Sequence, residues 1–93
     1  MKTFIVERNI PGAETLTKAE LKDISAKSNA VVAALGVPYV WQRTYAAGDK
    51  LYCIHDAESA EDIYRHARNG GFPADNVAEV KSVFGPETAM AEV

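Results

Sequence analysis

Cysteine is nearly absent from this chain: of its 93 residues, only Cys53 carries a thiol. A single cysteine excludes an internal disulfide and any metal cluster held by several thiolates. Cys53 stands in an apolar segment, where we expect a small core residue and not a nucleophile. The ligands of any bound metal would therefore be mainly oxygen atoms and imidazole nitrogens.

An excess of positive charge and a long hydrophobic run are also missing. Ten Lys and Arg residues against thirteen Asp and Glu residues give a net charge of −3, which argues against binding to nucleic acid through bulk charge. No apolar run is long enough to cross a membrane, and Glu7 and Arg8 interrupt the first segment too early for a signal peptide. We expect a cytoplasmic protein that binds neither nucleic acid nor membranes.

The chain carries none of three common enzyme signatures: a glycine-rich phosphate loop, a nucleophile elbow or an HExxH motif. Its length fits one domain over residues 1–93, with residues 86–93 as a loose tail. A domain of this size buries a thin core, which favours an oligomer.

Hydrophobic periodicity predicts a four-stranded sheet and two helices. The strands are expected at residues 2–8, 39–45, 51–56 and 77–84, and the helices at 18–35 and between Ser59 and Gly70. Thr17 and Glu20 form a capping box for the first helix, and Ser59 is expected to cap the second. Gly36 and Gly70-Gly71 end the two helices.

The order βαββαβ predicts an α+β fold, a ferredoxin-like sandwich with both helices on one face of the sheet. We expect the first and third strands to be the inner ones and to run parallel, so that their carboxyl ends lie side by side. The other sheet face also carries apolar side chains, either Trp41 and Tyr45 or Val40 and Ala46. Such a stripe favours a homodimer through the open sheet face, a dimeric α+β barrel. A monomer with partly exposed aromatics is the alternative.

Glu7 is unusual because a carboxylate inside a central strand is costly to bury without a partner. With parallel inner strands it would lie near His55 and Asp56, and the last strand would add Asp75 and Glu79. Carboxylates and an imidazole suit a divalent ion such as Ni, Co, Mn or Zn. A set of salt bridges is the alternative, with these basic residues as partners: Arg8, Arg43 and Lys81.

His66 stands four residues after Asp62 on the second predicted helix, beside Ile63 and at the border of the apolar face. One interpretation is a half-buried boundary residue that bonds Asp62. The other is a metal ligand or a pH-sensitive contact, because neutral imidazole is a common ligand of Ni, Cu and Zn.

Four segments carry a family resemblance in the right order and spacing: FIVERNIPGA, SNAV, WQRTY with DKLYC, and HARNGGFPADNVAEV. Together they resemble a small bacterial family of nickel-binding, nickel-responsive proteins, formerly a domain of unknown function, over residues 3–88. The resemblance implies a ferredoxin-like homodimer that binds Ni²⁺ through carboxylate and imidazole groups.

The resemblance also implies ligands. Glu7 matches the glutamate of the V-E-R strand, and His66 matches the histidine of the H-A-R helix. Asp56 keeps a carboxylate where the family has Glu, whereas His55 departs from the pattern and adds a candidate. Glu7 should turn away from the face that the second helix covers, so one ion in one protomer would not easily hold both Glu7 and His66.

The sequence therefore predicts a homodimeric, non-catalytic protein that binds Ni²⁺, with Co²⁺ and Zn²⁺ as alternatives, for sequestration or homeostasis. The alternative is an enzyme of the cofactor-free monooxygenase or isomerase type, which needs a cavity between facing sheets and His55 or Glu7 as base. An interaction domain without a ligand is a third interpretation.

Overall fold

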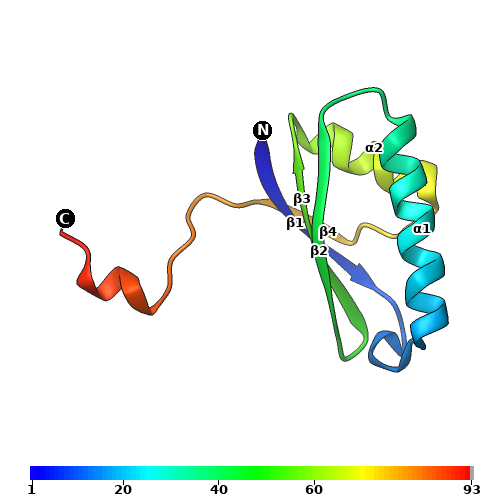
Figure 1. Cartoon of the computed structure of the whole chain (residues 1–93), viewed down its shortest axis with the longest axis horizontal. Helices are drawn as coiled ribbons and strands as arrows, with labels where there is room; N and C mark the ends of the chain where they lie inside the picture. The colour runs from blue at the N-terminus through cyan, green and yellow to red at the C-terminus, as the bar shows by residue number, and fades with distance from the viewer. Residues whose placement is uncertain (93) are drawn as a thin grey trace.

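Four strands form one sheet in the order β2-β3-β1-β4. The computed structural model describes residues 1–92, with β1 (Lys2–Asn9), β2 (Tyr39–Ala47), β3 (Lys50–Ala57) and β4 (Asn76–Glu79). Helices α1 (Lys18–Ala34) and α2 (Ala60–Gly70) both cover the same sheet face (Figure 1). The ferredoxin-like α+β fold and the identity of the two inner strands are as the sequence predicts.

The expected direction of the inner strands is wrong. β1 and β3 pair antiparallel, with Lys2 opposite Ala57 and Glu7 opposite Tyr52. The reason is topological: the crossover through α1 makes β2 parallel to β1, and the tight hairpin then reverses β3. The carboxyl end of β1 therefore lies beside the amino end of β3, and the predicted meeting of Glu7 with His55 does not occur.

The helix ends follow local chemistry. The Thr17 hydroxyl accepts a hydrogen bond from the Glu20 amide, and the Glu20 carboxylate accepts one from the Thr17 amide, which completes the predicted capping box. Gly71 ends α2 with φ of 68°, a left-handed conformation that favours glycine. Ser59 holds the N-cap position of α2, but its side chain makes no capping hydrogen bond, contrary to the prediction.

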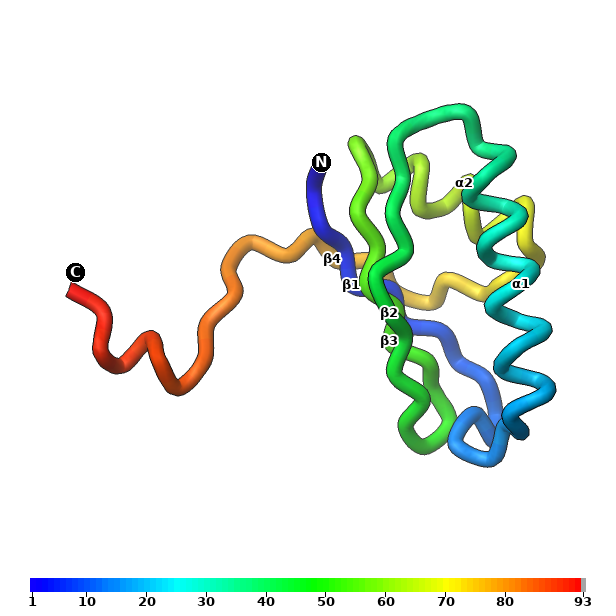
Figure 2. The backbone as a smooth tube through the Cα atoms, in the orientation of Figure 1, coloured from blue at the N-terminus to red at the C-terminus, as the bar shows by residue number. Residues whose placement is uncertain are grey.

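The last strand is shorter than predicted. β4 ends at Glu79, opposite Phe4, and one further backbone hydrogen bond joins the Val80 amide to the Thr3 carbonyl oxygen over 2.8 Å. Residues 80–92 lead away from the two layers and include a short 3-10 helix, η2 (Pro86–Met90), which the sequence analysis did not predict (Figure 2). Val83 and Phe84, expected in the strand, are 89% and 79% exposed. Val93, the last residue of the predicted tail, lies outside the described residues.

The core lies between the sheet and the helices and is filled mainly by the sheet and α2. Phe4 and Val6 of β1 pack there with Ile63 of α2, which is fully buried. α1 contributes much less, because Ser28 is its only buried residue. The long helix therefore covers the sheet without filling the space beneath it. Within residues 1–92, no helix is both long and apolar enough to cross a membrane.

Candidate functional site

Two buried histidines meet between the helix layer and the sheet. His55 comes from β3 and His66 from α2, and each is 1% exposed. Their ring centroids are 5.0 Å apart. His55 points to the helix side because it shares the alternating buried face of β3 with Leu51 and Cys53.

Each histidine is held by a neighbouring hydroxyl group. Nδ1 of His55 lies 2.7 Å from the hydroxyl oxygen of Tyr39, and Nε2 of His66 lies 3.0 Å from the hydroxyl oxygen of Ser28. Nδ1 of His66 is buried without a hydrogen-bond partner. The predicted half-buried His66 bonded to Asp62 is therefore incorrect: the ring is fully buried, and its hydrogen bond goes to α1.

Both imidazoles are neutral at neutral pH. Burial lowers the pKa of His55 to about 3, helped by the nearby His66 and Arg8. Burial, followed by the charge of Arg8, lowers the pKa of His66 to about 4. Burial also raises the pKa of Tyr39, so its hydroxyl stays protonated. Neutral imidazole is the form that coordinates a metal.

Arg8 is a buried cation beside this pair, only 3% exposed. Its Nε donates to the sulfur of Cys53 over 3.4 Å, its Nη1 donates to the carbonyl oxygen of Pro73, and its guanidinium lies 5.5 Å from the ring centroid of Phe72. None of the ion pairs among residues 1–92 includes Arg8. The predicted salt bridge between Arg8 and the carboxylates is therefore not formed.

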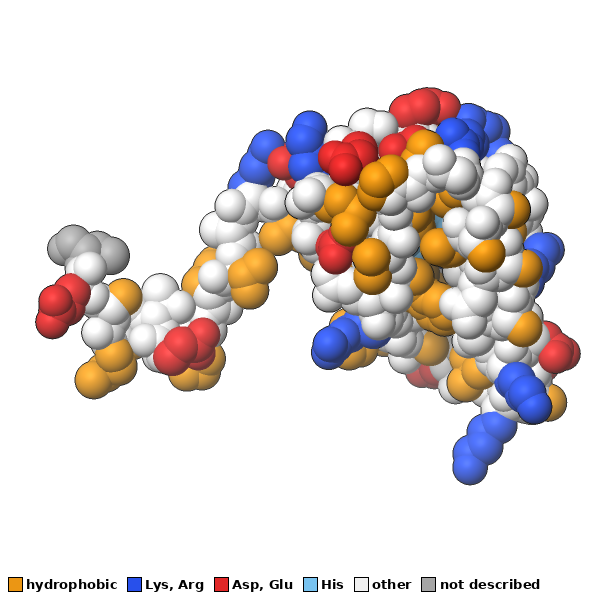
Figure 3. Space-filling model, turned by 45° about the horizontal axis from the view of Figure 1, so that its top comes forward, with side chains coloured by type: hydrophobic (Ala, Val, Ile, Leu, Met, Phe, Trp, Pro, Cys, Tyr) orange, Lys and Arg blue, Asp and Glu red, His pale blue; other side chains and the backbone are white. Residues whose placement is uncertain are grey.

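A cavity of about 360 Å³ lies between α1 and the sheet and joins these groups. Figure 3 shows hydrophobic side chains gathered in this part of the molecule, along the boundary between α1 and the sheet. Polar groups line it at a few points: Arg8, Ser25, Ser28, Thr44, His55 and His66. The remaining lining includes Trp41 and Phe72. Mostly apolar walls with a few convergent polar groups are typical of a small-molecule site.

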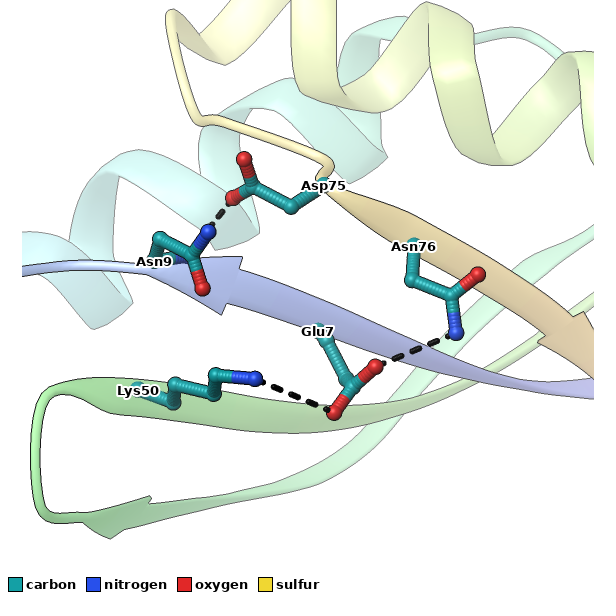
Figure 4. Close-up of polar contacts among 5 residues, drawn as sticks. All are labelled: Glu7, Asn9, Lys50, Asp75 and Asn76. Atoms are coloured by element: carbon teal, nitrogen blue, oxygen red, sulfur yellow. Dashed lines mark hydrogen bonds and ion pairs between the residues drawn. The ribbon is translucent and has the colours of Figure 1, made fainter.

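Glu7 lies on the opposite, open face of the sheet. Lys50 Nζ is 3.8 Å from one of its carboxylate oxygens, and Asn76 donates to the other over 3.1 Å (Figure 4). Asp75 is a close neighbour through the backbone, but its carboxylate accepts from the Asn9 amide over 2.6 Å. Glu79 lies further along β4, opposite Phe4, and pairs with Lys81.

Asp56 also faces away from the helices, but at the other end of the sheet. Its carboxylate accepts hydrogen bonds from Thr3 over 2.7 Å and from Gln42 over 2.8 Å. In the sheet, Asp56 lies opposite Thr3, which is four residues before Glu7 on β1. Asp56 and Glu7 are therefore separated by roughly 14 Å along the strand direction.

The four sequence candidates thus fall into three places: a buried pair, His55 with His66, and two separate carboxylates, Glu7 and Asp56. Within the described residues, no group of three or more His, Cys, Asp and Glu side chains is arranged to hold a metal ion. One protomer brings together two imidazoles and no complete ligand set.

Arg8 is a buried residue of this candidate site that the sequence-based predictions missed. The signal was present, because Arg8 continues the alternation of Phe4 and Val6 on the buried face of β1. Ser28 was also missed: it is buried, but a serine on a helix carries no sign of a histidine partner 38 residues further along the chain.

Comparisons with known proteins agree with the fold. The family model described as "Nickel responsive protein SCO4226-like" matches residues 4–80. The crystal structure of SCO4226 from Streptomyces coelicolor A3(2) superposes with a TM-score of 0.72, covering 88% of this chain and 99% of that one at 21% sequence identity. A search of curated proteins found no match.

Proposed function

Because this chain belongs to the family of SCO4226-like nickel responsive proteins, we propose that it binds Ni²⁺ and that His55 and His66 are ligands. The observation that carries this proposal is the pair of neutral imidazoles with centroids 5.0 Å apart. Imidazole nitrogen is a good ligand for Ni²⁺, and also for the alternatives Co²⁺ and Zn²⁺.

The two imidazole nitrogens are the kind of donor that Ni²⁺ binds, but two donors do not fill its coordination shell. Two imidazoles leave positions that water or another molecule in the cavity would fill. Nε2 of His66 is shared with Ser28, so metal binding there would displace the serine hydroxyl. The charge of Arg8 opposes a bare dication nearby, which favours a metal that enters together with anionic ligands.

We propose Glu7 and Asp56 as separate, outer ligands on the open face. They are too far apart in one protomer to share an ion, so a second copy would have to complete each site. This assignment depends on a homodimer in which two open faces meet.

The exposed apolar residues of the open face support such a dimer. Ile5 is 39% exposed, Val40 43% and Tyr45 55%. A hollow of about 860 Å³ lies on this face, between Ile5 and Ile54 on one side and Val83 and Phe84 on the other. Burying these side chains against a second copy would remove apolar surface from water.

For the cell, we propose cytoplasmic sequestration or homeostasis of nickel without catalysis. The enzyme alternative requires a cavity between facing sheets. The cavity that holds His55 lies instead between α1 and the sheet, so it gives that alternative no specific support.

The test is isothermal titration of the untagged protein with NiCl₂, CoCl₂ and ZnCl₂ at pH 7.5. We expect saturable heat with Ni²⁺. No heat with any of the three metals would refute metal binding.

Single variants then assign the ligands. We expect His66→Ala and His55→Ala each to weaken nickel binding at least tenfold, whereas Glu7→Ala and Asp56→Ala should change only the stoichiometry. Asp62→Ala is the control, because Asp62 lies on α2 four residues before His66, whose hydrogen bond goes to Ser28 instead. Unchanged affinity in both histidine variants would refute the proposed pair.

A further inference from the structure

The positive charge of Arg8 gives the cavity a preference for anions, and the nickel proposal does not use this preference. Arginine is charged at any accessible pH, and a buried charge is costly unless it is paired. The two hydrogen bonds of Arg8 go to the sulfur of Cys53 and to the backbone carbonyl of Pro73, and neither acceptor is a carboxylate. They occupy two of the five guanidinium N–H groups.

A second, independent observation concerns the neighbouring polar atoms. Nδ1 of His66 is a buried polar atom without a partner, and His66 and Arg8 line the same cavity. Ser28 lines it as well and carries a hydroxyl group. The polar groups of this cavity are thus a cation and several neutral hydrogen-bonding groups, and no carboxylate of residues 1–92 lines it.

The apolar side chains of the lining indicate what kind of ligand would fill the cavity. Leu21 and Ile24 come from α1, Trp41 and Leu51 from the sheet, and Phe72 from the segment after α2. These side chains favour an apolar body, whereas a small inorganic anion would leave most of the cavity unfilled.

We propose that the cavity binds a small organic acid, with its carboxylate on Arg8 and its apolar body between α1 and the sheet. Guanidinium and carboxylate are complementary, since two parallel N–H groups can donate to the two oxygens. The ligand would enter between α1 and β2, where Leu21 and Ala46 are exposed members of the lining. This inference is separate from nickel binding.

The chain supplies its own reporter for the test. Trp41 is the only tryptophan and lines the cavity. The experiment titrates the full chain, in EDTA to remove metals, with hexanoate, hexanamide and inorganic phosphate, and follows Trp41 emission. We expect saturable binding of hexanoate, with hexanamide and phosphate at least tenfold weaker.

Several results would overturn the proposal. Absence of any hexanoate signal would do so, as would equal affinity for hexanamide, which would mean that charge is not recognised. Phosphate binding as tight as hexanoate would indicate a simple anion site. Because EDTA is present throughout, each result is independent of whether the protein binds nickel.

Two variants locate the site without touching Arg8. Ala46→Phe should narrow the entrance and weaken hexanoate binding at least tenfold. Ala33→Phe is the matched control, because Ala33 is an exposed alanine of α1 that does not line the cavity. Wild-type affinity in Ala46→Phe would overturn the proposed location. Arg8→Met should abolish the preference for hexanoate over hexanamide if the variant folds, and the Ala46 result remains decisive if it does not.

Discussion

The imidazole rings of His55 and His66 lie in edge-to-face contact, with centroids 5.0 Å apart and an interplanar angle of 60°. They come from different layers of the sandwich, and burial keeps both neutral. Because a charged imidazole would have to sit beside another histidine and Arg8, this contact links the stability of the fold to pH.

We expect the metal-free protein to lose stability as the pH falls below 6.5. The pKa of each histidine is about 6.5 in the unfolded chain and lower in the folded protein, so the unfolded state binds more protons in this range. Each contribution is complete above pH 6.5; that of His66 is lost toward pH 4 and that of His55 toward pH 3. Each histidine should add a slope of about 1.4 kcal/mol per pH unit at its steepest.

Urea unfolding at pH 7, 6 and 5 measures this dependence. His66→Gln should remove about half of the slope, because one of the two titrating groups is gone. A free energy of unfolding that stays constant from pH 7 to pH 5 would show that the histidines are not held neutral by burial.

Much of the fold could be predicted from the sequence because its signals are local. The capping box at Thr17 and Glu20 fixes the start of α1, and the alternation of Phe4 and Val6 identifies the buried face of β1. Strand direction is not a local property. The error at β1 and β3 arose there. It placed Glu7 beside His55, whereas His55 lies opposite Phe4 and on the other face of the sheet from Glu7.

The candidate site was predictable only in part. His55 and His66 were identified as candidates, but their contact depends on how α2 is docked, which no spacing of eleven residues specifies. Ser28 and Tyr39 complete the pair from still further along the chain. The role of Arg8 could have been seen, since the strand alternation places it on the buried face.

The core prediction concerns Ile63, which is fully buried on α2. Ile63→Ala should lower the free energy of unfolding by about 2–5 kcal/mol, because it leaves a cavity as well as removing apolar contacts. Val83→Ala, at 89% exposure, should change it by less than about 0.5 kcal/mol. Urea unfolding of both variants checks this, and similar losses would contradict the described core.

The two helix starts give a matched pair. Thr17→Ala removes a hydroxyl that accepts from the Glu20 amide, so it should cost about 0.5–2 kcal/mol of stability. Ser59→Ala removes a side chain that makes no capping bond and should cost clearly less. Thermal unfolding of the two variants decides this; a larger loss at Ser59 would mean that α2 is capped after all.

The dimer can be tested with two residues of nearly equal exposure. Ile5 on the open face is 39% exposed, and Tyr64 on α2 is 40% exposed. We expect light scattering to give about twice the chain mass of 10.1 kDa for the wild type and for Tyr64→Glu, but the single-chain mass for Ile5→Glu. A wild-type monomer at micromolar concentration would contradict the proposed interface.

Because α1 buries so few side chains against the sheet, it should separate from the sheet more easily than the rest of the domain unfolds. With one buried residue in seventeen, this helix has little apolar surface to lose when it separates from the sheet. Its amide hydrogens should therefore exchange with solvent by local opening, well before those of β1 and β3 in the middle of the sheet. Such opening would give solvent and ligands access to the buried imidazoles while the strands of the sheet stay folded.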